Sequence, residues 1–349
     1  MSEPKVQIKN LYKIFGRKPA SMVQHVENGM SKPELLDVHG HVLGLNNINL
    51  DIPARGIQVI MGLSGSGKST LIRHINRLIE PTAGEMIVDG EDVLQMSDTA
   101  LRDFRRFKAS MVFQKFALMP HHTVIENVRY GVDIQGVAEK EAAERAQRWL
   151  ERVGLKGFEQ HYPAQLSGGM QQRVGLARAL ATDAEILLMD EAFSALDPLI
   201  RTDMQNVLLD LQEELHKTII FITHDLDEAL RIGDNIAILR DGKMVQSGNP
   251  QDIVLRPADD YVTDFIQDIN RARVLQVGTA MSPATKKCDG PQIPHNTIIE
   301  EALQTCVDSH SETATVTKAG KAVGSITLDQ MVRAIARPEA VSADDANYR

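Results

Sequence analysis

Short apolar runs alternate with longer stretches of helical periodicity along much of the chain. Four runs predict buried strands, at residues 57–61, 110–113, 186–189 and 218–222. Segments with apolar residues at helical spacing lie between and beside these runs, at residues 71–78, 139–153, 170–181 and 199–215. Because strands that alternate with helices favour parallel pairing, we expect an α/β fold with a mainly parallel sheet.

Other segments predict strands and helices outside this alternation. Residues 6–11 and 42–52 predict two early strands, with a polar, helix-prone stretch at 18–37 between them. Further predictions are a strand at 85–88, a helix at 98–107 that begins after Ser97, and a hairpin formed by 236–239 and 244–246.

The pattern divides the chain into a large and a small domain. We expect a first domain over residues 1–270, which contains a helical subdomain at about 115–165, and a Gly- and Pro-containing linker at 271–295. A second unit at 296–337 combines helical and strand patterns, and the acidic, polar end at 338–349 is expected to be disordered.

Composition narrows the possible classes of function. The 349 residues include 43% hydrophobic and 24% charged residues, which are ordinary values for a globular protein with a sizeable core. The formal net charge of −9 argues against a general nucleic-acid binder, so no nucleic-acid partner is expected. We expect no membrane span and no secretory signal region. Cys288 and Cys306 make a disulfide framework improbable, which fits a reducing cytoplasm.

Residues 62–70 have the strongest chemical signature in the chain. This stretch follows the predicted strand at 57–61 and precedes a helical segment, which is the context that a phosphate-binding loop requires. Its glycines allow backbone N–H groups to point at phosphates, and the helix N-terminus adds partial positive charge. Lys68 can reach the β- and γ-phosphates, and the Ser69 hydroxyl can bind Mg²⁺. The predicted ATP-binding residues of the loop are Gly62, Ser64, Gly65, Ser66, Gly67, Lys68, Ser69 and Thr70.

Four polar residues follow the predicted strands at positions where a ligand can bind. Parallel strands present ligand sites at their carboxyl ends, and Gln114, Asp190, Glu191 and His224 all lie at such ends. Asp190 is the acidic partner expected to hold Mg²⁺, directly or through water. Glu191 can orient the water that attacks the γ-phosphate, and His224 can donate to that phosphate. The Gln114 amide oxygen can approach either Mg²⁺ or the attacking water.

Residues 167–169 offer a second anion-binding element. Ser167, Gly168 and Gly169 precede a predicted helix, so this helix N-terminus can also bind phosphate. One nucleotide needs only one such cradle, so two chains are expected to share each nucleotide, each chain presenting one cradle.

The order of these motifs resembles the ATPases of ABC transporters. The stretch LSGGMQQR at 166–173 is similar to the signature motif of that family, and the resemblance covers roughly residues 5–270. Several stretches also resemble the glycine betaine/proline branch, which imports quaternary amine osmoprotectants. They are NLYKIFG at 10–16, MGLSGSG at 61–67, NRLIEPT at 76–82, FALMPH at 116–121 and DEAFSALDPLIR at 190–201.

This resemblance implies a role for each matching residue. It implies that Phe15 stacks on adenine, with Tyr12 as the second candidate, and that Ser69, Gln114 and Asp190 hold Mg²⁺. It further implies Glu191 as the catalytic base, with His224 and Gln114 assisting. Ser167, Gly168, Gly169 and Gln171 are expected to close over ATP held by the opposing subunit of a homodimer, and Asp197 to couple the two sites.

The same resemblance implies the setting of the reaction. It implies a P-loop ATPase fold with an antiparallel β subdomain, a helical subdomain, ATP and Mg²⁺ as ligands, and membrane permease subunits as partners. A periplasmic or extracellular substrate-binding protein is a further expected partner, and the expected location is the cytoplasmic face of the cell membrane.

Residues 296–337 resemble a single CBS module, a small unit that senses adenine nucleotides or ionic conditions. The stretch VGSITL at 323–328 carries the similarity. Three roles are open for it: regulation of activity, stabilisation of a dimer, and a vestigial module without a function of its own.

Two other classes of function remain as alternatives. A DNA-repair or translation ATPase of the same superfamily usually has a long coiled coil or two ATPase halves, and this sequence shows neither. A nucleotide sensor with little turnover does not need the base Glu191. Which amine or amino acid is carried, among glycine betaine, choline, proline betaine and proline, is not evident from the sequence.

Overall fold

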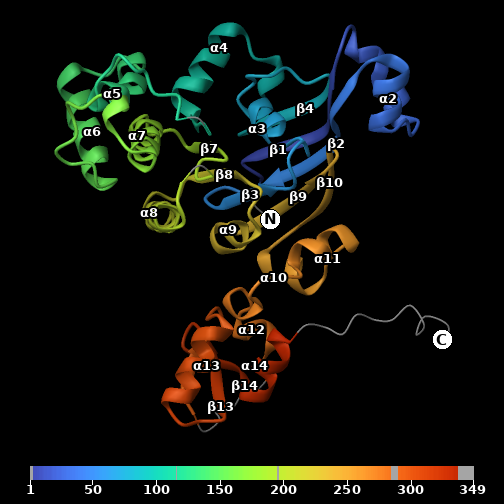
Figure 1. Cartoon of the computed structure of the whole chain (residues 1–349), viewed down its shortest axis with the longest axis vertical. Helices are drawn as coiled ribbons and strands as arrows, with labels where there is room; N and C mark the ends of the chain where they lie inside the picture. The colour runs from blue at the N-terminus through green and yellow to red at the C-terminus, as the bar shows by residue number, and fades with distance from the viewer. Residues whose placement is uncertain (1–2, 115, 195, 284–289, 337–349) are drawn as a thin grey trace. The chain divides into compact units, whose positions relative to one another are not determined.

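The computed structural model describes residues 3–114, 116–194, 196–283 and 290–336. The chain forms two compact units, residues 1–248 and 249–349, and each is described by itself. The first unit ends before residue 270, where the sequence pattern sets the end of the large domain. Figure 1 labels the elements of each unit.

A six-stranded sheet forms the centre of the first unit. Its strand order is β10-β9-β3-β8-β7-β6, and all neighbouring pairs are parallel except β9 and β10. Each residue of β3, β7 and β8 is buried, which matches the largely apolar runs that predicted them. The strands are β3 (Ile57–Met61), β6 (Ala109–Val112), β7 (Ile186–Asp190), β8 (Thr218–Thr223), β9 (Asn235–Arg240) and β10 (Lys243–Gly248).

A second, antiparallel sheet has the order β2-β1-β4-β5. Its strands are β1 (Val6–Phe15), β2 (Val42–Ile52), β4 (Ala83–Val88) and β5 (Glu91–Asp92). One hydrophobic cluster joins this sheet to the six-stranded sheet through α3 (Lys68–Ile75), and it includes Ile8, Ile60, Leu71 and Ile220. The helix after the phosphate loop is therefore anchored by apolar side chains from both sheets, as the predicted antiparallel β subdomain requires.

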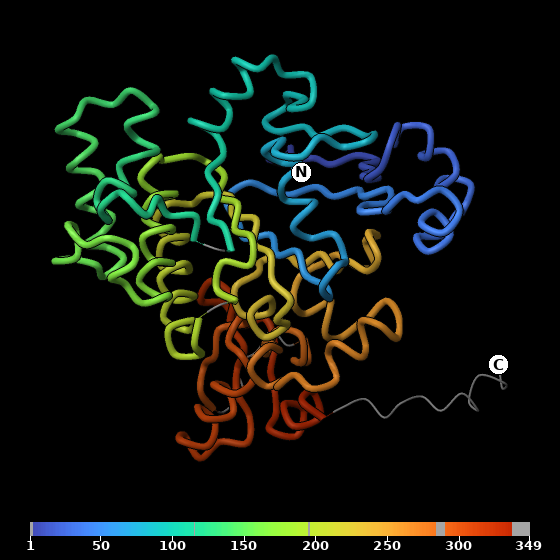
Figure 2. Tube along the Cα trace, turned by 45° about the horizontal axis from the view of Figure 1, so that its top comes forward, coloured from blue at the N-terminus to red at the C-terminus, as the bar shows by residue number. Residues whose placement is uncertain are grey.

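Three helices pack together in a helical region, and only the first two lie within the predicted bounds of about 115–165. They are α5 (Val124–Ile134), α6 (Glu139–Arg152) and α7 (Gly168–Ala181), and they share a separate hydrophobic cluster. Figure 2 shows this green part of the tube gathered at one side of the unit. A capping box between Thr123 and Glu126 starts α5, and the short η4 (Pro163–Gln165) precedes α7.

The helix-prone stretch between the first two strands forms three short helices. They are η1 (Pro19–Met22), α1 (Val23–Glu27) and α2 (Lys32–His39), and a capping box between Ser31 and Glu34 starts the last. Val26 and Leu35 of this insertion are buried in a small cluster with Tyr12. The insertion therefore covers one face of β1.

The remaining helices of the first unit connect the strands. The predicted helix at 98–107 is divided into α4 (Asp98–Asp103) and a π-helical turn, η3 (Phe104–Lys108). Pro198 is the first residue of α8 (Pro198–Leu215), as its fixed φ angle suits. The other two are η2 (Val93–Gln95) and α9 (Leu226–Ile232).

The second unit contains a four-stranded sheet of order β11-β14-β13-β12, with only β12 and β13 parallel. Buried residues of α13 and α14, among them Ile299, Cys306 and Met331, contribute to its core. Among its described residues, the stretch expected as a linker, 271–295, carries two short strands and two short helical turns. The elements are α10 (Pro250–Leu255), α11 (Asp260–Ile266), η5 (Arg271–Arg273), α12 (Val277–Ala280), β11 (Ser282–Pro283), β12 (Gln292–Pro294), α13 (Ile299–Asp308), β13 (Thr313–Lys318), β14 (Lys321–Thr327) and α14 (Leu328–Ile335).

Within the described residues, no helix is both long enough and apolar enough to cross a membrane. Cys288 and the predicted disordered end at 338–349 lie outside the described residues.

Candidate nucleotide-binding site

The phosphate loop turns sharply between β3 and α3. Gly62, Gly65 and Gly67 have φ angles of +150°, +79° and +104°, which side-chain-bearing residues rarely adopt. A Cβ atom on Gly67 would lie 2.7 Å from the carbonyl oxygen of Gly44. The loop can therefore fold this closely only with glycine at these positions.

Lys68 folds back over this loop. Its Nζ donates to the carbonyl oxygens of Gly62 and Leu63, at 2.8 and 3.1 Å, and the side chain is only 4% exposed. Burial lowers the pKa of Lys68, while the nearby Glu191 and Asp190 carboxylates favour its charged form. The ammonium group is thus held at the loop by contacts that a bound phosphate can replace.

Asp190, the last residue of β7, is 1% exposed and fully hydrogen-bonded. Its Oδ1 accepts from the Ser69 hydroxyl at 2.8 Å, and its Oδ2 accepts from Arg73 Nη2 at 3.0 Å. Two residues that the sequence assigned to Mg²⁺ are therefore in direct contact.

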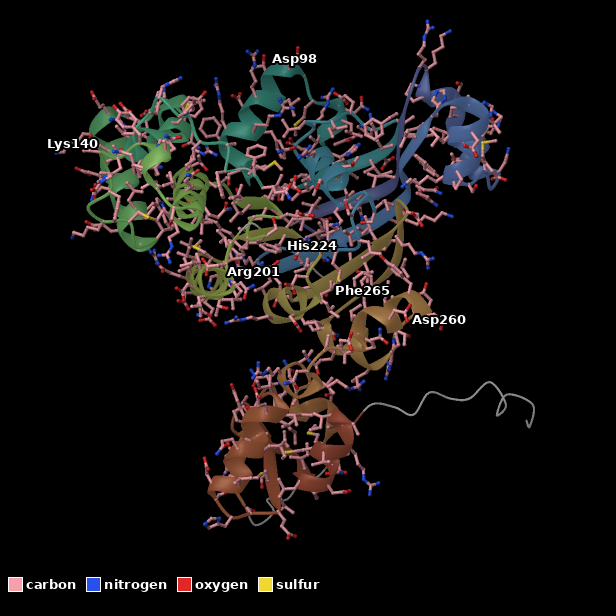
Figure 3. The ribbon with its side chains drawn as sticks, in the orientation of Figure 1. Asp98, Lys140, Arg201, His224, Asp260 and Phe265 are labelled. Atoms are coloured by element: carbon pink, nitrogen blue, oxygen red, sulfur yellow. The ribbon has the colours of Figure 1, made fainter. Side chains whose placement is uncertain are left out.

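Two other strand-end residues, Gln114 and His224, lie close to the Glu191 carboxylate. The Glu191 backbone has a left-handed φ of +46°, and its N–H donates to the Ile222 carbonyl oxygen at 3.1 Å. The carboxylate accepts from Gln114 Nε2 at 2.9 Å and lies 3.7 Å from both Lys68 Nζ and His224 Nδ1. Figure 3 labels His224, on the loop between β8 and α9. Side chains from the ends of three strands thus meet around one carboxylate.

The residues at this site fit a phosphate chain. The Ser66 side chain is buried, and its hydroxyl has no hydrogen-bond partner. The loop therefore contains a buried donor that a phosphate oxygen can satisfy. Ser64 is exposed at the mouth of the same loop, and Thr70 lies in the first turn of α3.

The oxygen groups of Ser69, Asp190 and Gln114 suit a hard cation such as Mg²⁺. No group of three or more His, Cys, Asp or Glu side chains in the described ranges has the geometry of a metal site. The donor set therefore fits a cation that takes its remaining ligands from phosphate oxygens and water.

The second predicted cradle lies at the start of α7. Ser167 caps this helix by accepting from the Met170 N–H at 3.3 Å, and Gln171 Nε2 donates to the Leu166 carbonyl oxygen at 3.2 Å. Ser167 and Gly168 are exposed. In the described part of the chain, the hydrogen bonds of these residues are local to α7, so the structure does not join them to the phosphate loop.

Asp197 caps α8 by accepting from the Ile200 N–H at 3.1 Å, and it is exposed. One turn into this helix, Arg201 Nη1 donates to Asp225 at 3.0 Å, and Figure 3 labels Arg201. The start of α8 is therefore fixed to the loop that carries His224.

The two aromatic candidates differ in accessibility. Tyr12 is 6% exposed and packs in the core with Val26 and Leu35, and this burial raises its pKa. Phe15 is 42% exposed at the end of β1, with Lys13 Nζ 4.9 Å from its ring centroid. Only Phe15 has a ring accessible to a base, so Tyr12 is excluded as the stacking residue by its burial.

Two contacts at the loop were missed by sequence reasoning. Ser69 and Arg73 both donate to Asp190. Because Arg73 lies one helical turn after Ser69, the i, i+4 spacing could have predicted that both side chains reach the same partner. Lys32, from the insertion after β1, places its Nζ 3.4 Å from the Gly65 carbonyl oxygen. No sequence signal links that lysine to the loop.

A cavity of about 780 Å³ lies at the opposite, amino-terminal ends of the parallel strands. Its charges largely neutralise one another, since Lys5 pairs with Asp89 at 2.6 Å and with Glu185. Lys5 and Lys108 together lower the pKa of Glu185 to about 2. This cavity contains none of the predicted site residues.

Comparison with known proteins agrees with this geometry. A family model described as ABC transporter matches residues 45–194. The glycine betaine transport ATP-binding protein OpuAA of Bacillus subtilis is 54% identical over 83% of this chain and 70% of that protein. The chain belongs to the ABC transporter family. The ABC protein ProV of Escherichia coli, a glycine betaine/proline betaine transport system ATP-binding protein, is 47% identical over 97% of this chain and 84% of its own length.

A solved ABC structure shows the same fold. The dimeric, post-hydrolysis ATP-binding cassette MJ0796, bound to ADP and phosphate, is 34% identical, with a TM-score of 0.60 over 70% of this chain and 98% of that one. The predicted ABC ATPase fold is therefore confirmed, and the chain is an ATP-binding, ATP-hydrolysing subunit of a transport system.

Proposed function

We propose that this ATPase energises the import of quaternary amine osmoprotectants, with glycine betaine, choline, proline betaine or proline as the solute. The observation that carries this proposal is the similarity to a glycine betaine/proline betaine transport protein over 97% of the chain. Residues 296–336, beyond the ATPase motifs, lie within the length that this similarity spans.

The strand-end residues Gln114, Asp190, Glu191 and His224 support a specific role for each side chain in ATP hydrolysis. The phosphate loop and Lys68 bind the phosphates, and Phe15 stacks on adenine. Glu191 accepts a proton from the attacking water, a role that suits a carboxylate held 2.9 Å from the Gln114 amide. His224, which is more than half exposed, donates to the γ-phosphate. Ser69, Asp190 and Gln114 would hold Mg²⁺, which would supply positive charge beside the phosphates.

Two chains complete each site in this proposal. Because Ser167, Gly168, Gly169 and Gln171 lie apart from the loop of their own chain, they serve the nucleotide of the opposing subunit. Asp197 at the start of α8 couples the two sites. The helical subdomain binds membrane permease subunits at the cytoplasmic face, and a periplasmic or extracellular binding protein delivers the solute.

The second unit is proposed to contain a CBS-like module at 296–337. Its candidate roles are the sensing of nucleotide or ionic strength, the stabilisation of the dimer, and a vestigial module without a function of its own. Transport is measured in reconstituted vesicles at several salt concentrations, with and without residues 296–349. An unchanged salt response in the shortened protein contradicts sensing.

The solute is tested by uptake of labelled choline, glycine betaine and proline in cells that carry Lys68→Ala. Lys243→Ala, a change at an exposed lysine on β10, is the matched control. Loss of one uptake activity in the Lys68 variant alone identifies the solute. Unchanged uptake of all three contradicts the proposed solute class and leaves the ATPase assignment in place.

A further inference from the structure

The loop after Gln114 has an unusual backbone. Phe116 and Ala117 have φ angles of +47° and +48°, so two consecutive non-glycine residues lie in the left-handed region. Such a conformation costs free energy at each residue and persists only where surrounding contacts impose it. The contacts that impose it here come from α7.

Arg178 of α7 binds both strained residues through their backbone. Its Nη1 donates to the Ala117 carbonyl oxygen at 2.7 Å, and its Nη2 donates to the Phe116 carbonyl oxygen at 3.1 Å. A planar guanidinium group suits two acceptors at a fixed spacing. Burial lowers the pKa of Arg178, and none of the ion pairs among the described residues includes it. The arginine is thus used to hold backbone rather than to neutralise a carboxylate.

The loop also lies along the helix. A Cβ atom on Gly168 would be 3.8 Å from Phe116 Cζ, and one on Gly175 would be 3.7 Å from the Phe116 carbonyl oxygen. Both distances are ordinary van der Waals separations. Phe116 therefore packs against α7 between the first and the third turn of that helix. Gly168 belongs to the cradle proposed to act on the partner's nucleotide.

A second contact fixes the far end of the loop to α5. The fully buried Asn127 accepts from the Met119 N–H at 2.8 Å and donates to the Met119 and His122 carbonyl oxygens at 3.1 Å. The loop is therefore held to the helical subdomain at two points, and Arg178 is the one nearer to Gln114.

We propose that Arg178 is a positioning residue for Gln114. By fixing the backbone at Phe116, it sets where the Gln114 amide lies against Glu191, and it ties that position to the helix that begins with the second cradle. This inference rests on the proposed role of Gln114 in ATP hydrolysis.

A double-mutant cycle in the full-length protein tests the proposal. Wild type, Arg178→Ala, Gln114→Ala and the double variant are compared for kcat and KM of Mg²⁺-dependent ATP hydrolysis. We expect Arg178→Ala to lower kcat about 10- to 100-fold, with little change in KM because the phosphate loop is untouched. In the Gln114→Ala background, the same arginine change is expected to have little further effect.

Two further variants separate positioning from folding. Arg178→Lys keeps the charge but not the planar fork, so kcat falls part of the way toward that of the alanine variant. Gln135→Ala is the matched control, since the Gln135 amide also holds two backbone carbonyls, of Arg106 and Thr182, near the other end of α7. This control is expected to leave kcat unchanged.

The outcomes distinguish this inference from the proposal on which it rests. If Gln114→Ala lowers kcat and the two losses multiply in the double variant, Arg178 acts independently of Gln114 and the inference is overturned. If Gln114→Ala has no effect, the proposed role of Gln114 itself fails. Should Arg178→Ala not fold, wild-type kcat in Arg178→Lys overturns the inference, and a fall that disappears in the Gln114→Ala background supports it.

Discussion

The Ser69 hydroxyl donates a hydrogen bond of 2.8 Å to Asp190, although the strands that position these two residues are not neighbours in the sheet. Ser69 follows β3 and Asp190 ends β7, and β8 lies between these strands in the sheet. The two groups are therefore brought together by the strand order and not by closeness in sequence. Their contact defines where a cation can bind beside the phosphates.

Replacing Asp190 by Asn is expected to weaken the response to Mg²⁺. The amide keeps the size and can still accept from Ser69, but it loses the charge that attracts the cation. We expect the Mg²⁺ concentration for half-maximal ATPase activity to rise about 10- to 100-fold. Binding of a fluorescent ATP analogue in the presence of EDTA is the control, and it should change little. A wild-type Mg²⁺ dependence would exclude Asp190 from the metal site.

Glu191→Gln is expected to separate ATP binding from hydrolysis. The amide cannot accept a proton from water, so kcat should fall about 10²- to 10⁴-fold while ATP still binds. Without turnover, two chains should remain closed over ATP and Mg²⁺, which light scattering after size-exclusion chromatography measures as a dimer. If the variant stays monomeric under these conditions, the sharing of each nucleotide by two chains is wrong. The same variant without ATP serves as the control.

Phe15→Ala is expected to weaken the binding of adenine nucleotides specifically. Stacking of a base on an aromatic ring contributes about 1–3 kcal/mol, which corresponds to a loss of about 5- to 150-fold in affinity. Titration calorimetry with ATP measures this loss, and Phe15→Tyr should restore binding. Inorganic tripolyphosphate has no base, so its affinity should be the same in all three proteins. Equal ATP affinity in the alanine variant would place the base elsewhere.

The buried His74 is expected to make the first unit less stable in mild acid. It is fully buried on α3, and desolvation lowers its pKa to about 4, below the value of about 6.5 for an unfolded chain. Below about pH 6.5 this histidine binds a proton in the unfolded chain, whereas in the folded protein it stays neutral until the pH approaches about 4. The free energy of unfolding therefore falls as the pH drops from about 6.5 to about 4, by about 3 kcal/mol in total.

His74→Asn removes this titration and keeps a donor toward the Thr70 carbonyl, the contact made by His74 Nδ1. Urea unfolding is compared at pH 7.5 and pH 5.0 for both proteins. Wild type should lose about 2 kcal/mol more than the variant over this interval. Parallel loss in the two proteins would show that His74 titrates normally in the folded state.

The strand-end residues could be predicted because parallel strands bring their carboxyl ends to one edge. Gln114, Asp190, Glu191 and His224 each follow an apolar run. The structure places Gln114 and His224 beside the Glu191 carboxylate, while Asp190, the preceding residue, accepts a hydrogen bond from Ser69. The alternation of strand and helix patterns predicted the parallel sheet in the same way, whereas the antiparallel β subdomain was expected only from the family resemblance.

The family resemblance favoured Phe15 over Tyr12, but the sequence pattern alone could not decide between them, because the choice depends on what covers β1. The insertion after this strand packs Val26 and Leu35 against Tyr12, and nothing in the local sequence indicates that contact. Arg178 was also missed, since its partners are backbone carbonyls, which every residue carries. The strands Ser282–Pro283 and Gln292–Pro294 are too short to show any periodicity, so their region was interpreted as a linker.

The position of β3 in the sheet has a consequence for how the protein is made. Both of its neighbours, β8 and β9, come from residues 218–240, so β3 has no strand to pair with until most of the first unit has been synthesised. At about 5–20 residues per second, that wait lasts on the order of 10–30 s. During this time a strand with four apolar residues out of five, and the glycine loop attached to it, are exposed on the nascent chain. A largely apolar strand without a partner is a suitable target for a chaperone that binds apolar segments over this interval.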